Sequence, residues 1–501
     1  MKNLFNSIQL KKPKKNSFDL SHDVKLSGKM GNLIPILTQE CIPGDQFKIG
    51  CESLIRFAPL VSPVMHRMDV TMHYFFVPNR ILWENWEDFI TNASSTHLFP
   101  TLPIGNPAGY SADSLRLMDY IGVPPPPVGS TTSSAINALP LAAYQCIYNE
   151  YYRDQNLVPE VNYKLIDGNN VSNFDLYLQR KRAWEHDYFT SALPFAQKGA
   201  AVDIPLGQIN AEGPVYVNNP TADTILDGTP YDITVDNNST TVTGANQLFA
   251  EINNGSLDPT TINDLRRAFR LQEWLEKNAR GGTRYIENIL SHFGVRSSDK
   301  RLQRPEYITG VKSPVVISEV LNTSGTEDQL PQGNMSGHGI SVGSGNYGSY
   351  YCEEHGYIIG IMSVMPKTAY QQGIPKTFLK NDTLDFYWPS FANIGEQEVK
   401  VEELYAYTSS NNNTFGYVPR YSEYKFNPSR VAGDFRTTLD YWHLGRIFSS
   451  TPTLSQEFIE CTPEDVERIF AIQDDTDNLY CHVYNKLSAL RPMPKFGTPM
   501  F

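Results

Sequence analysis

The chain has 501 residues, and its 54 Asp and Glu outnumber its 42 Lys and Arg to give a net charge of −12. This length exceeds the size at which a single hydrophobic core normally keeps growing, so we expect insertions or additional domains. The 28 tyrosines, 25 phenylalanines, 34 glycines and 34 prolines favour a loop-rich β protein over a helical one. Only 19% of the residues are charged, a low share for a freely soluble monomer, so we expect much surface to be buried against other chains.

The cysteines and the apolar pattern exclude several classes of protein. The six cysteines form no CxxC pair and have no Cys/His zinc spacing, which favours a reduced compartment, free buried thiols and no metal or other cofactor. The first residues, MKNLFNSIQLKKPKKN, lack the apolar core of a signal peptide. No run approaches the roughly 20 apolar residues of a membrane span. We therefore expect a protein that is made and matures in a cytoplasm, without membrane insertion.

Residues 1–32 hold seven lysines against two aspartates and too few large apolar residues for a core of their own, which predicts an extended basic arm. The densest charge lies in the KKPKK cluster, where Pro13 opposes helix formation. The lysines of this cluster are Lys11, Lys12, Lys14 and Lys15. The nearby SGKMG is not a phosphate-binding loop, because no Gly stands five residues before Gly28 and a Met follows the Lys.

Strand patterns follow the arm. Residues Cys41–Pro59 are strand material broken by a Pro-Gly pair, and Met68–Val77 alternates most cleanly of all, with apolar side chains on one face and polar ones on the other. His66 and His73 could be considered as metal ligands. A ladder histidine on a solvent face is the favoured interpretation, because no third ligand stands nearby.

Helical patterns come next. Residues 80–90 are predicted to be a helix with an apolar face, 91–134 a loop, and Leu139–Arg153 a helix with Pro140 in its first turn. The apolar face consists of Leu82, Trp86, Phe89 and Ile90. Further on, three adjacent residues carry side chains that catalysis uses, namely Glu185, His186 and Asp187. Adjacent side chains point in different directions on a helix or a strand, so we interpret this triplet as structural.

The charge pattern changes sharply after Lys198. Between Lys198 and Arg266 there is no Lys or Arg, against nine Asp and Glu. Such a segment is either disordered or a surface excursion whose short strands, Pro214–Val217 and Tyr231–Val235, pair with themselves or with neighbours. Because its apolar residues come in short β-like runs, we favour an ordered insertion.

An amphipathic helix is predicted over Ile262–Arg280, followed by a stop at Gly281-Gly282. Thr283 can cap a short helix that Gly294 ends, and a polar loop then leads into a β-rich run over Tyr307–Val316. Between residues 264 and 304, ten Lys and Arg stand against five Asp and Glu, a balance typical of a solvated, salt-bridged connector.

The glycine-rich run Gly333–Gly348 leads into more strand rather than into a helix, so we interpret it as a flexible loop and not as a dinucleotide-binding loop. Residues Cys352–His355 contain ligand-type side chains, but their tight packing fits no standard metal site. Gly356–Met365 is apolar on both faces and is predicted to be a buried strand. A helix start is predicted at Thr462-Pro463, and the final MPKFGTPMF is expected to lie over a neighbouring chain as a strap.

Aromatic rings near the C-terminal end are interspersed with basic residues, an arrangement that can stack on the bases and neutralise the phosphates of single-stranded DNA. The basic residues are Arg420, Lys425, Arg430 and Arg436. An edge strand with packed tyrosines explains the same pattern at least as well.

Several long stretches resemble the major capsid proteins of microviruses, the small tailless single-stranded-DNA phages, and in particular their gokushovirus branch. The signature stretch is RYIENILSHFGVRSSDKRLQRPEY, residues 284–307. The others are FDLSHDVKLSGKMGNLIPI, LYLQRKRAWEHDYFTSALPFAQK, LDFYWPSFANIGE, FGYVPRYSEYKF and PSRVAGDFR. The resemblance covers most of the chain outside about 91–134 and 199–262.

This resemblance implies a mainly β fold, an eight-stranded antiparallel jelly-roll sandwich with large loop and helical insertions. The domains would be a basic N-terminal arm, 1–32; the first part of the jelly roll, 33–207, with a helical insertion at about 79–155; a surface insertion, 208–262; and the remainder with helices and a C-terminal strap, 263–501. The implied function is a non-enzymatic T=1 icosahedral shell, built from pentamers of this chain, around a circular single-stranded DNA genome.

The resemblance also implies partners and sites. The partners are other copies of the chain, the DNA genome, a small basic DNA-binding protein, scaffold and pilot proteins, and a host surface receptor, with assembly in the bacterial cytoplasm and a final location in the virion. We expect the basic cluster to face the interior and touch DNA or the small basic protein, with Arg420, Lys425 and Arg436 as weaker candidates. The expected threefold protrusion contains Asp223, Asp227, Asp236, Asn237 and Asn238.

Other interpretations stay open at this point. The basic arm could merely clamp a neighbouring subunit. A jelly-roll carbohydrate-binding protein or glycoside hydrolase would need two carboxylates facing each other across a groove. A bacterial structural or adhesive protein would need an export signal, which this sequence lacks.

Overall fold

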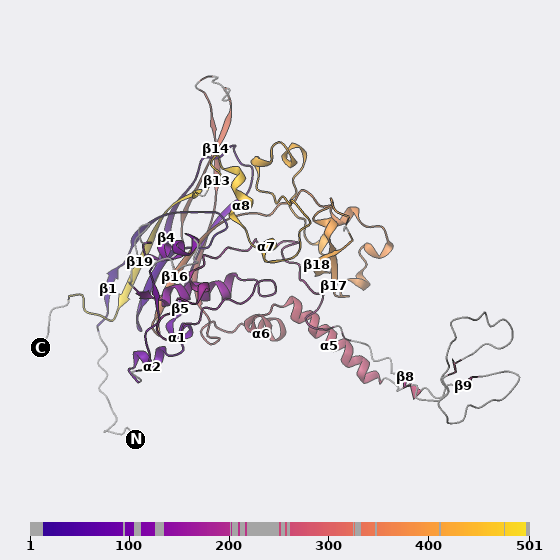
Figure 1. The fold of residues 1–501 in the computed structure, drawn as a ribbon, viewed down its shortest axis with the longest axis horizontal. Coiled ribbons are helices and arrows are strands. Elements are labelled where there is room, and N and C mark those ends of the chain that lie inside the picture. The colour runs from indigo at the N-terminus through magenta and orange to yellow at the C-terminus, as the bar shows by residue number, and fades with distance from the viewer. Residues whose placement is uncertain are drawn as a thin grey trace, which may run out of the picture. The chain divides into compact units, whose positions relative to one another are not determined.

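The computed structural model describes residues 14–93, 96–104, 112–125, 135–200, 202, 261–323, 325, 332–345, 348–409, 412–474 and 476–496, together with four short strands between residues 209 and 257. The chain divides into two compact units, whose elements are drawn in Figure 1. The larger unit contains residues 1–196 and 281–501, and the smaller contains residues 197–280.

Two antiparallel sheets form the centre of the larger unit (Figure 1). The first sheet has the strand order β1-β19-β4-β14-β13, with β2 also paired to β19 and β15 also paired to β4. Its strands are β1 Asn16–Asp19, β2 His22–Gly28, β4 Gln46–Phe57, β13 Val316–Leu321, β14 Met335–Ser344, β15 Gly348–Tyr351 and β19 Leu479–Arg491. The second sheet has the order β12-β5-β16-β3. Its strands are β3 Ile34–Cys41, β5 Met68–Pro78, β12 Glu306–Pro314 and β16 Gly356–Pro366.

The main core lies between the two sheets, and alternating residues of each strand fill it. On β5, the inward residues are at most 2% exposed, which confirms the predicted alternation. They are Met68, Val70, Met72, Tyr74 and Phe76. Strand β16 is buried at every position, as its two apolar faces predicted. The expectation of a mainly β, antiparallel sandwich is therefore confirmed.

Helices inserted after β5 cover the outer face of the second sheet. They are α1 Asn79–Leu82, α2 Trp86–Ile90, α3 Ala112–Ile121, α4 Leu139–Ile147 and the π-helical turn η2 Tyr148–Tyr152. Phe75 and Val77 of β5 lie in one cluster with Leu141 and Tyr144 of α4. The predicted helix over Leu139–Arg153 is confirmed as α4 together with η2.

Two predictions in this region are wrong. The helix predicted over residues 80–90 is two short helices, because Trp83 adopts an extended backbone between them and turns its ring inward, where its Nε1 donates to Asp167 at 2.8 Å. The region 91–134 is not only loop, because it contains α3 and the strand β6 Thr101–Pro103, paired with β7 Ala135–Asn137. Helix α3 and strand β6 are both packed into the core cluster that contains α4 and the outer face of β5, through Leu102 of β6 and Leu117 and Met118 of α3.

The prediction of an extended N-terminal arm without a core of its own is corrected in part. Residues 16–28 form β1 and β2, which pair with the last strand of the chain, β19. Lysine content obscured the alternation, in which Leu26 packs partly against the core while the neighbouring Lys25 is exposed. A long lysine side chain on the solvent side of an edge strand is compatible with a sheet.

The glycine-rich run predicted to be a flexible loop is the regular strand β14. Its buried positions are all small, namely Gly337, Gly339, Ser341 and Gly343. A β-carbon on Gly337 would collide with the backbone oxygen of Ser62, and one on Gly339 would come within 2.9 Å of the Phe57 ring. The glycines therefore allow a neighbouring backbone and ring to approach the sheet closely, which is a packing role and not a source of flexibility.

The signature stretch follows its predicted course, with one change. Helix α6 covers Tyr285–Phe293 and ends at Gly294, whose φ of 69° is left-handed as a helix-ending glycine requires. Its N-cap is Arg284 rather than Thr283, and the Arg284 backbone N–H donates to Glu287 at 3.1 Å. The stretch then continues into β12 and the start of β13, which confirms the β-rich run predicted over Tyr307–Val316.

The smaller unit contains α5, Ile262–Arg280, with the bounds that the sequence predicted. Two short antiparallel pairs precede it, β8 Ile209–Asn210 with β11 Ser256–Leu257 and β9 Tyr216–Val217 with β10 Ala250–Glu251. Strand β9 lies within the predicted Pro214–Val217, whereas Tyr231–Val235 lies outside the described residues.

The segment between β16 and β19 forms a second excursion from the sandwich. It contains β17 Glu396–Lys400 paired with β18 Thr414–Pro419, and the one-turn helices α7 Gln456–Ile459 and α8 Pro463–Val466, the latter at the predicted helix start. Its 3₁₀ turns are η4 Lys376–Phe378, η5 Thr383–Asp385, η6 Pro389–Phe391, η7 Val401–Glu403, η8 Ser422–Tyr424, η9 Gly433–Arg436, η10 Asp440–Trp442 and η11 Glu467–Ile469; η3 Phe174–Tyr177 lies earlier in the chain. Val399, Phe415 and Phe458 centre a separate small core here.

All six cysteines are buried and free, as predicted. The two histidines considered as metal ligands are partly buried instead of lying on a solvent face, because the helical insertion and the second excursion cover them. His73 contacts the Tyr152 hydroxyl at 2.8 Å, and His66 contacts the Lys367 carbonyl at 2.6 Å. Burial lowers the pKa of His66 to about 4, and burial next to Arg182 lowers the pKa of His73 to about 4.

The first prediction concerns Gly337. The change Gly337→Ala should lower the free energy of unfolding by about 1–3 kcal/mol, because the new β-carbon meets fixed backbone. Urea unfolding of the dissociated chain, followed by tryptophan fluorescence, measures this loss. Ser336→Ala, at the exposed neighbouring position of the same strand, is the matched control and should cost little. Equal stability of the two variants would contradict the packing role of Gly337.

The second prediction concerns pH. The folded chain protonates His66 only near pH 4, whereas the unfolded chain does so below about 6.5, so the unfolded state binds more protons between these values. Stability should therefore fall as the pH drops from 6.5 to 4. His66→Gln, whose amide can donate to the Lys367 carbonyl, should make this pH dependence shallower by up to about 1.4 kcal/mol per pH unit. His186→Gln, at an exposed position, should leave it unchanged; equal slopes for the His66 variant and the wild type would refute the prediction.

Candidate functional site

The basic N-terminal cluster leads directly into the first sheet. Lys14 and Lys15 are exposed and precede β1, whereas Lys11 and Lys12 lie outside the described residues. The Lys15 ammonium donates to the Gly44 carbonyl at 2.6 Å and lies 5.2 Å from the centre of the Tyr351 ring. Lys15 is therefore bound to the sandwich of its own chain.

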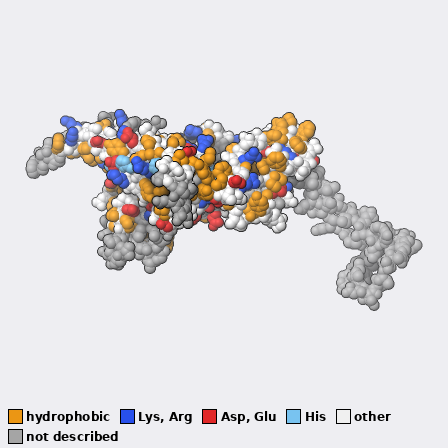
Figure 2. All heavy atoms as spheres, turned by 90° about the horizontal axis from the view of Figure 1, so that it is seen from above, with side chains coloured by type: hydrophobic (Ala, Val, Ile, Leu, Met, Phe, Trp, Pro, Cys, Tyr) orange, Lys and Arg blue, Asp and Glu red, His pale blue; other side chains and the backbone are white. Residues whose placement is uncertain are grey.

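The second excursion presents exposed rings on one side, which we call the aromatic surface. It is defined by Phe378, Leu384, Phe386, Tyr387, Trp388, Ile394, Tyr424 and Phe426, each between 42% and 75% exposed. Figure 2 shows hydrophobic side chains gathered at the end of the larger unit where Figure 1 places β17 and β18. The extent of this surface exceeds what scattered single apolar residues would explain, which indicates a contact site.

A buried ion pair supports the aromatic surface from beneath. The Lys380 ammonium lies 3.1 Å from the Glu423 carboxylate and 3.8 Å from the centre of the Tyr424 ring. Burial alone would lower the pKa of Lys380, but its contacts with Tyr424 and Glu423 raise it above the usual value. Burial would raise the pKa of Glu423, and hydrogen bonds from Gln397 and Lys380 lower it instead. The surface is thus held in place before anything binds.

Two of the predicted basic residues lie at this surface. The Arg420 guanidinium donates to the Leu384 carbonyl at 2.9 Å and covers the Tyr421 ring at 4.9 Å, and the Lys425 ammonium donates to the Arg420 carbonyl at 3.3 Å. Arg436 has a different backbone partner, because its Nε donates to the Val431 carbonyl at 3.1 Å. The alternative of packed tyrosines also has support, since Tyr421 is 2% exposed and meets the Tyr387 ring at 5.0 Å.

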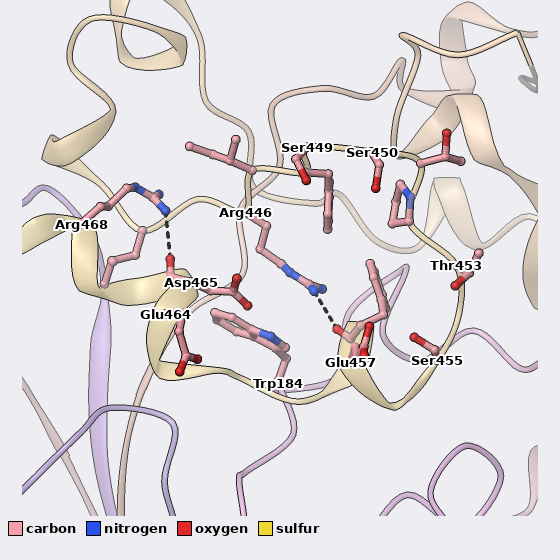
Figure 3. A pocket seen from close by; sticks show the side chains of 16 residues that line it. Trp184, Arg446, Ser449, Ser450, Thr453, Ser455, Glu457, Glu464, Asp465 and Arg468 are labelled. Atoms are coloured by element: carbon pink, nitrogen blue, oxygen red, sulfur yellow. Dashed lines mark hydrogen bonds between the residues drawn. The ribbon is translucent and has the colours of Figure 1, made fainter. Parts of the chain in front are cut away.

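A cavity of about 670 Å³ opens next to the segment 446–458 (Figure 3). Arg446 lies at its base, where its Nη2 donates to the Phe458 carbonyl at 2.7 Å and its guanidinium lies 4.1 Å from the Phe458 ring. Serine and threonine hydroxyls line the rim, with Glu457, Glu464 and Asp465. Asp465 accepts a hydrogen bond from Thr462 at 2.6 Å and so belongs to the start of α8. These contacts of Arg446 Nη2 and Asp465 thus belong to the local structure around the cavity.

The triplet Glu185, His186 and Asp187 is structural in its contacts. Burial would raise the pKa of Glu185, but hydrogen bonds from Lys312 and Lys367 lower it to about 2. The Asp187 carboxylate accepts from the Phe189 N–H at 2.9 Å and the Thr190 N–H at 2.8 Å, closing a turn. Glu185 and Asp187 therefore serve different structural partners, in agreement with the structural interpretation, and His186 is exposed.

The remaining expectations concern the protrusion, metal binding and membrane insertion. The expected protrusion residues, Asp223, Asp227, Asp236, Asn237 and Asn238, lie outside the described residues. Among the residues that the structure describes, no cluster of histidine, cysteine and carboxylate side chains could hold a metal ion. Within that same part of the chain, no helix has the length and apolar character needed to cross a bilayer.

Sequence reasoning missed the aromatic surface as a unit. The run LDFYWPSF places four rings close together, but strand alternation and helical periodicity are both absent there, so nothing in it indicated exposure. Lys380, which supports the rings, stands outside the run, and no sequence pattern distinguishes it from the exposed lysines of the chain. A dense cluster of rings next to several turn residues was the only available signal.

Comparison with known proteins extends the resemblance to the whole chain. The family described as "Capsid protein (F protein)" matches residues 6–501. The chain is 34% identical to the "Capsid protein VP1" of Chlamydia phage 1, over 100% of this chain and 98% of that protein. It is also 34% identical to the "Capsid protein VP1" of Bdellovibrio phage phiMH2K and 32% identical to that of Spiroplasma virus 4, in each case over 97% of this chain and 95% of the relative.

These relatives are capsid proteins of gokushoviruses, and the matches leave no large part of the chain unaccounted for. The structure agrees with a protein that packs against further chains. It exposes the aromatic surface, with Arg420 and Lys425 beside it, and the chain has a low share of charged side chains. The chain therefore belongs to the F-protein family of phage capsid proteins, in its gokushovirus branch, and is a structural, non-enzymatic component of the virion.

Proposed function

We propose that copies of this chain assemble, as pentamers, into a T=1 icosahedral shell that encloses a circular single-stranded DNA genome. The observation that carries the proposal is the match to capsid proteins along residues 6–501. The exposed aromatic surface and the low charge content supply faces that other copies can cover.

The sandwich is proposed to be an eight-stranded jelly roll, formed by β2, β3, β4, β5, β12, β14, β16 and β19. Numbered one to eight along the chain, these strands stand in the order 1-8-3-6 in the first sheet and 5-4-7-2 in the second. Each sheet thus alternates strands from both halves of the chain, the arrangement expected when a long hairpin rolls up as two Greek keys. This order supports the assignment.

The smaller unit is proposed to form the outer insertion, with residues 208–262 as a protrusion at the threefold axes that takes part in host attachment. Its support is twofold. The insertion belongs to a compact unit of its own, and residues 199–265 carry no basic side chain, which suits a position away from nucleic acid. Asp223, Asp227, Asp236, Asn237 and Asn238 would then be available on the outside.

The basic N-terminal cluster is proposed to face the genome or the small basic DNA-binding protein. Lys14 is exposed next to the first sheet, and Lys11 and Lys12 precede it. Lys15 contributes less, because the Gly44 carbonyl already binds its ammonium group. Arg420 and Lys425, next to exposed rings, and Arg436 are the weaker candidates. Scaffold and pilot proteins and a host receptor are further partners that the family relationship leads us to expect, with assembly in the bacterial cytoplasm.

The third prediction tests both the shell and its contents. Wild-type particles should appear in negative stain as closed icosahedral shells that contain DNA. Changing Lys11, Lys12, Lys14 and Lys15 together to Gln should leave shells intact but lower the DNA content severalfold, because phosphate attraction is lost. Extraction of DNA and the ratio of absorbance at 260 and 280 nm measure the content. Shells that fail to form would favour the clamp alternative, and full particles with unchanged salt sensitivity would refute the genome role.

The fourth prediction tests the insertion. Residues 208–260 should be replaceable by a short Gly/Ser linker without unfolding the sandwich, because Ile209 pairs with Leu257 and the ends of the excised segment are adjacent. Thermal unfolding of the larger unit should change by only a few degrees, while binding to host cells or the stability of particles should fall. Loss of the cooperative transition of the sandwich would show that the insertion is part of its core.

A further inference from the structure

The two sheets of the sandwich differ in what covers their outer faces. Helices cover the second sheet, whereas the side chains that point away from the core on β2, β4 and β19 remain accessible. We call these outward side chains the open face. On β19 the inward residues at 479, 481, 483, 487 and 489 are buried, so the positions between them belong to the open face. The open face is therefore defined by strand register.

Basic and aromatic side chains alternate across this face. Tyr480 of β19 lies opposite Arg56 of β4, and His482 lies between Lys25 of β2 and Leu54 of β4. Directly opposed residues in a sheet have β-carbons about 4.5–5.5 Å apart, so Arg56 lies next to the Tyr480 ring and Lys25 next to the His482 ring, whereas Lys48 lies opposite Ser488. The remaining members are Asp23, Lys48, Glu52, Tyr484 and Lys486, with Tyr351 of β15 next to β4.

The charges on the open face leave cations in excess. The Glu52 carboxylate pairs with Lys486, and the Asp23 carboxylate lies 2.8 Å from Nε2 of His482. Lys25, Lys48 and Arg56 are exposed, and within the described part of the chain no carboxylate comes within ion-pair distance of any of them. Three solvated cations are thus free to meet an anion.

Exposed rings lie between these cations. Tyr480 is 49% exposed and Tyr351 is 52% exposed, and the Lys15 ammonium already lies over the Tyr351 ring at 5.2 Å. A flat sheet surface with rings spaced among cations is the arrangement on which unpaired bases stack while their phosphates are neutralised. Figure 2 shows Lys, Arg and His side chains at the end of the larger unit where Figure 1 places β1 and β19.

We propose that the open face of the first sheet binds single-stranded DNA, with bases stacked on Tyr480, Tyr484 and Tyr351 and phosphates bound by Lys25, Lys48 and Arg56. The inference rests on the proposed function, and it identifies which wall of the sandwich faces the genome. Recognition is independent of base sequence, because the cations bind phosphates, which every nucleotide carries, and an aromatic ring can stack on any base.

Other occupants fit this face less well. A second copy of the chain would bury three cations without partners, which is costly. A small basic protein would meet charge of its own sign. The proposal excludes the far part of the same sheet, where β13 and β14 present Val316, Val320 and Val342 and no cation. Lys14 and Lys15 precede β1 at the edge of this sheet, and the Lys15 ammonium lies over the Tyr351 ring of the open face.

The test compares two sets of substitutions that remove equal charge. One variant carries Lys25→Gln, Lys48→Gln and Arg56→Gln on the open face. The control carries Arg266→Gln, Arg267→Gln and Arg270→Gln, at exposed positions of α5 in the smaller unit. Dissociated full-length chains are titrated with oligothymidine of about 20 nucleotides at several salt concentrations, with fluorescence anisotropy as the readout.

The open-face variant should bind DNA about tenfold or more weakly than the wild type. A plot of the logarithm of its affinity against the logarithm of the salt concentration should be less steep, with a slope smaller in magnitude by about 2 for three lost phosphate contacts. The control should stay within about twofold of the wild type. Equal weakening in both variants would reduce the effect to net charge and overturn the proposal.

A second measurement needs no substitution and covers the case of a variant that fails to fold. Wild-type particles are irradiated with ultraviolet light, and DNA-linked peptides are identified by mass spectrometry. Peptides that contain Tyr480 or Tyr484 should be linked. Particles that contain DNA but yield links only elsewhere would overturn this inference and leave the proposed function standing. Wild-type preparations that form no DNA-containing shells would overturn the proposed function, and this inference with it.

Discussion

One buried amide joins the two sheets of the sandwich. Asn485 of β19 accepts a hydrogen bond from the Tyr74 hydroxyl of β5 at 3.2 Å and donates one to the Ile36 carbonyl of β3 at 2.9 Å. All three residues are at most 1% exposed. Apolar packing has no preferred direction, whereas a buried amide without partners costs about 1–3 kcal/mol. These two hydrogen bonds therefore fix how the first sheet lies on the second. The excursions begin and end at strands of these sheets, so the positions of their ends depend on the same contact.

The same strand, β19, closes the fold in sequence as well as in space. It lies between the N-terminal strands and β4, so the two ends of the chain are neighbours in one sheet. The long excursions after β5 and after β16 are then anchored at both of their ends by paired strands. Each excursion therefore begins and ends in the sandwich, which supports it at two points.

Strong periodicity in the sequence predicted the fold where one physical effect dominated. Strands β5 and β16 bury their apolar residues, and Gly294 ends α6 because only glycine adopts its backbone angle easily. The helical spacing of apolar residues predicted the bounds of α5, although Phe269 and Trp274 on that helix remain exposed. Prediction failed where two effects competed. The glycines of β14 indicated flexibility but serve close packing. The lysines of residues 1–32 indicated an extended arm outside the core, but Lys25 points away from a strand that is paired into the first sheet. The open face and the aromatic surface could not be predicted, because exposure depends on which elements lie on top of a residue, and distant segments decide that.

The buried cysteines have a consequence for the chemistry of the particle. Burial raises the pKa of Cys481 to about 12 and also raises that of Cys146 and Cys461, so these thiols hold their protons near neutral pH. Alkylating reagents and oxidants attack the thiolate at an accessible sulfur. The native shell should therefore not react with maleimide dyes. A single cysteine introduced at an exposed position of a strand would then be the thiol that reacts, and it would be present once in every subunit. A regular array of labels could then be attached without removing any native residue.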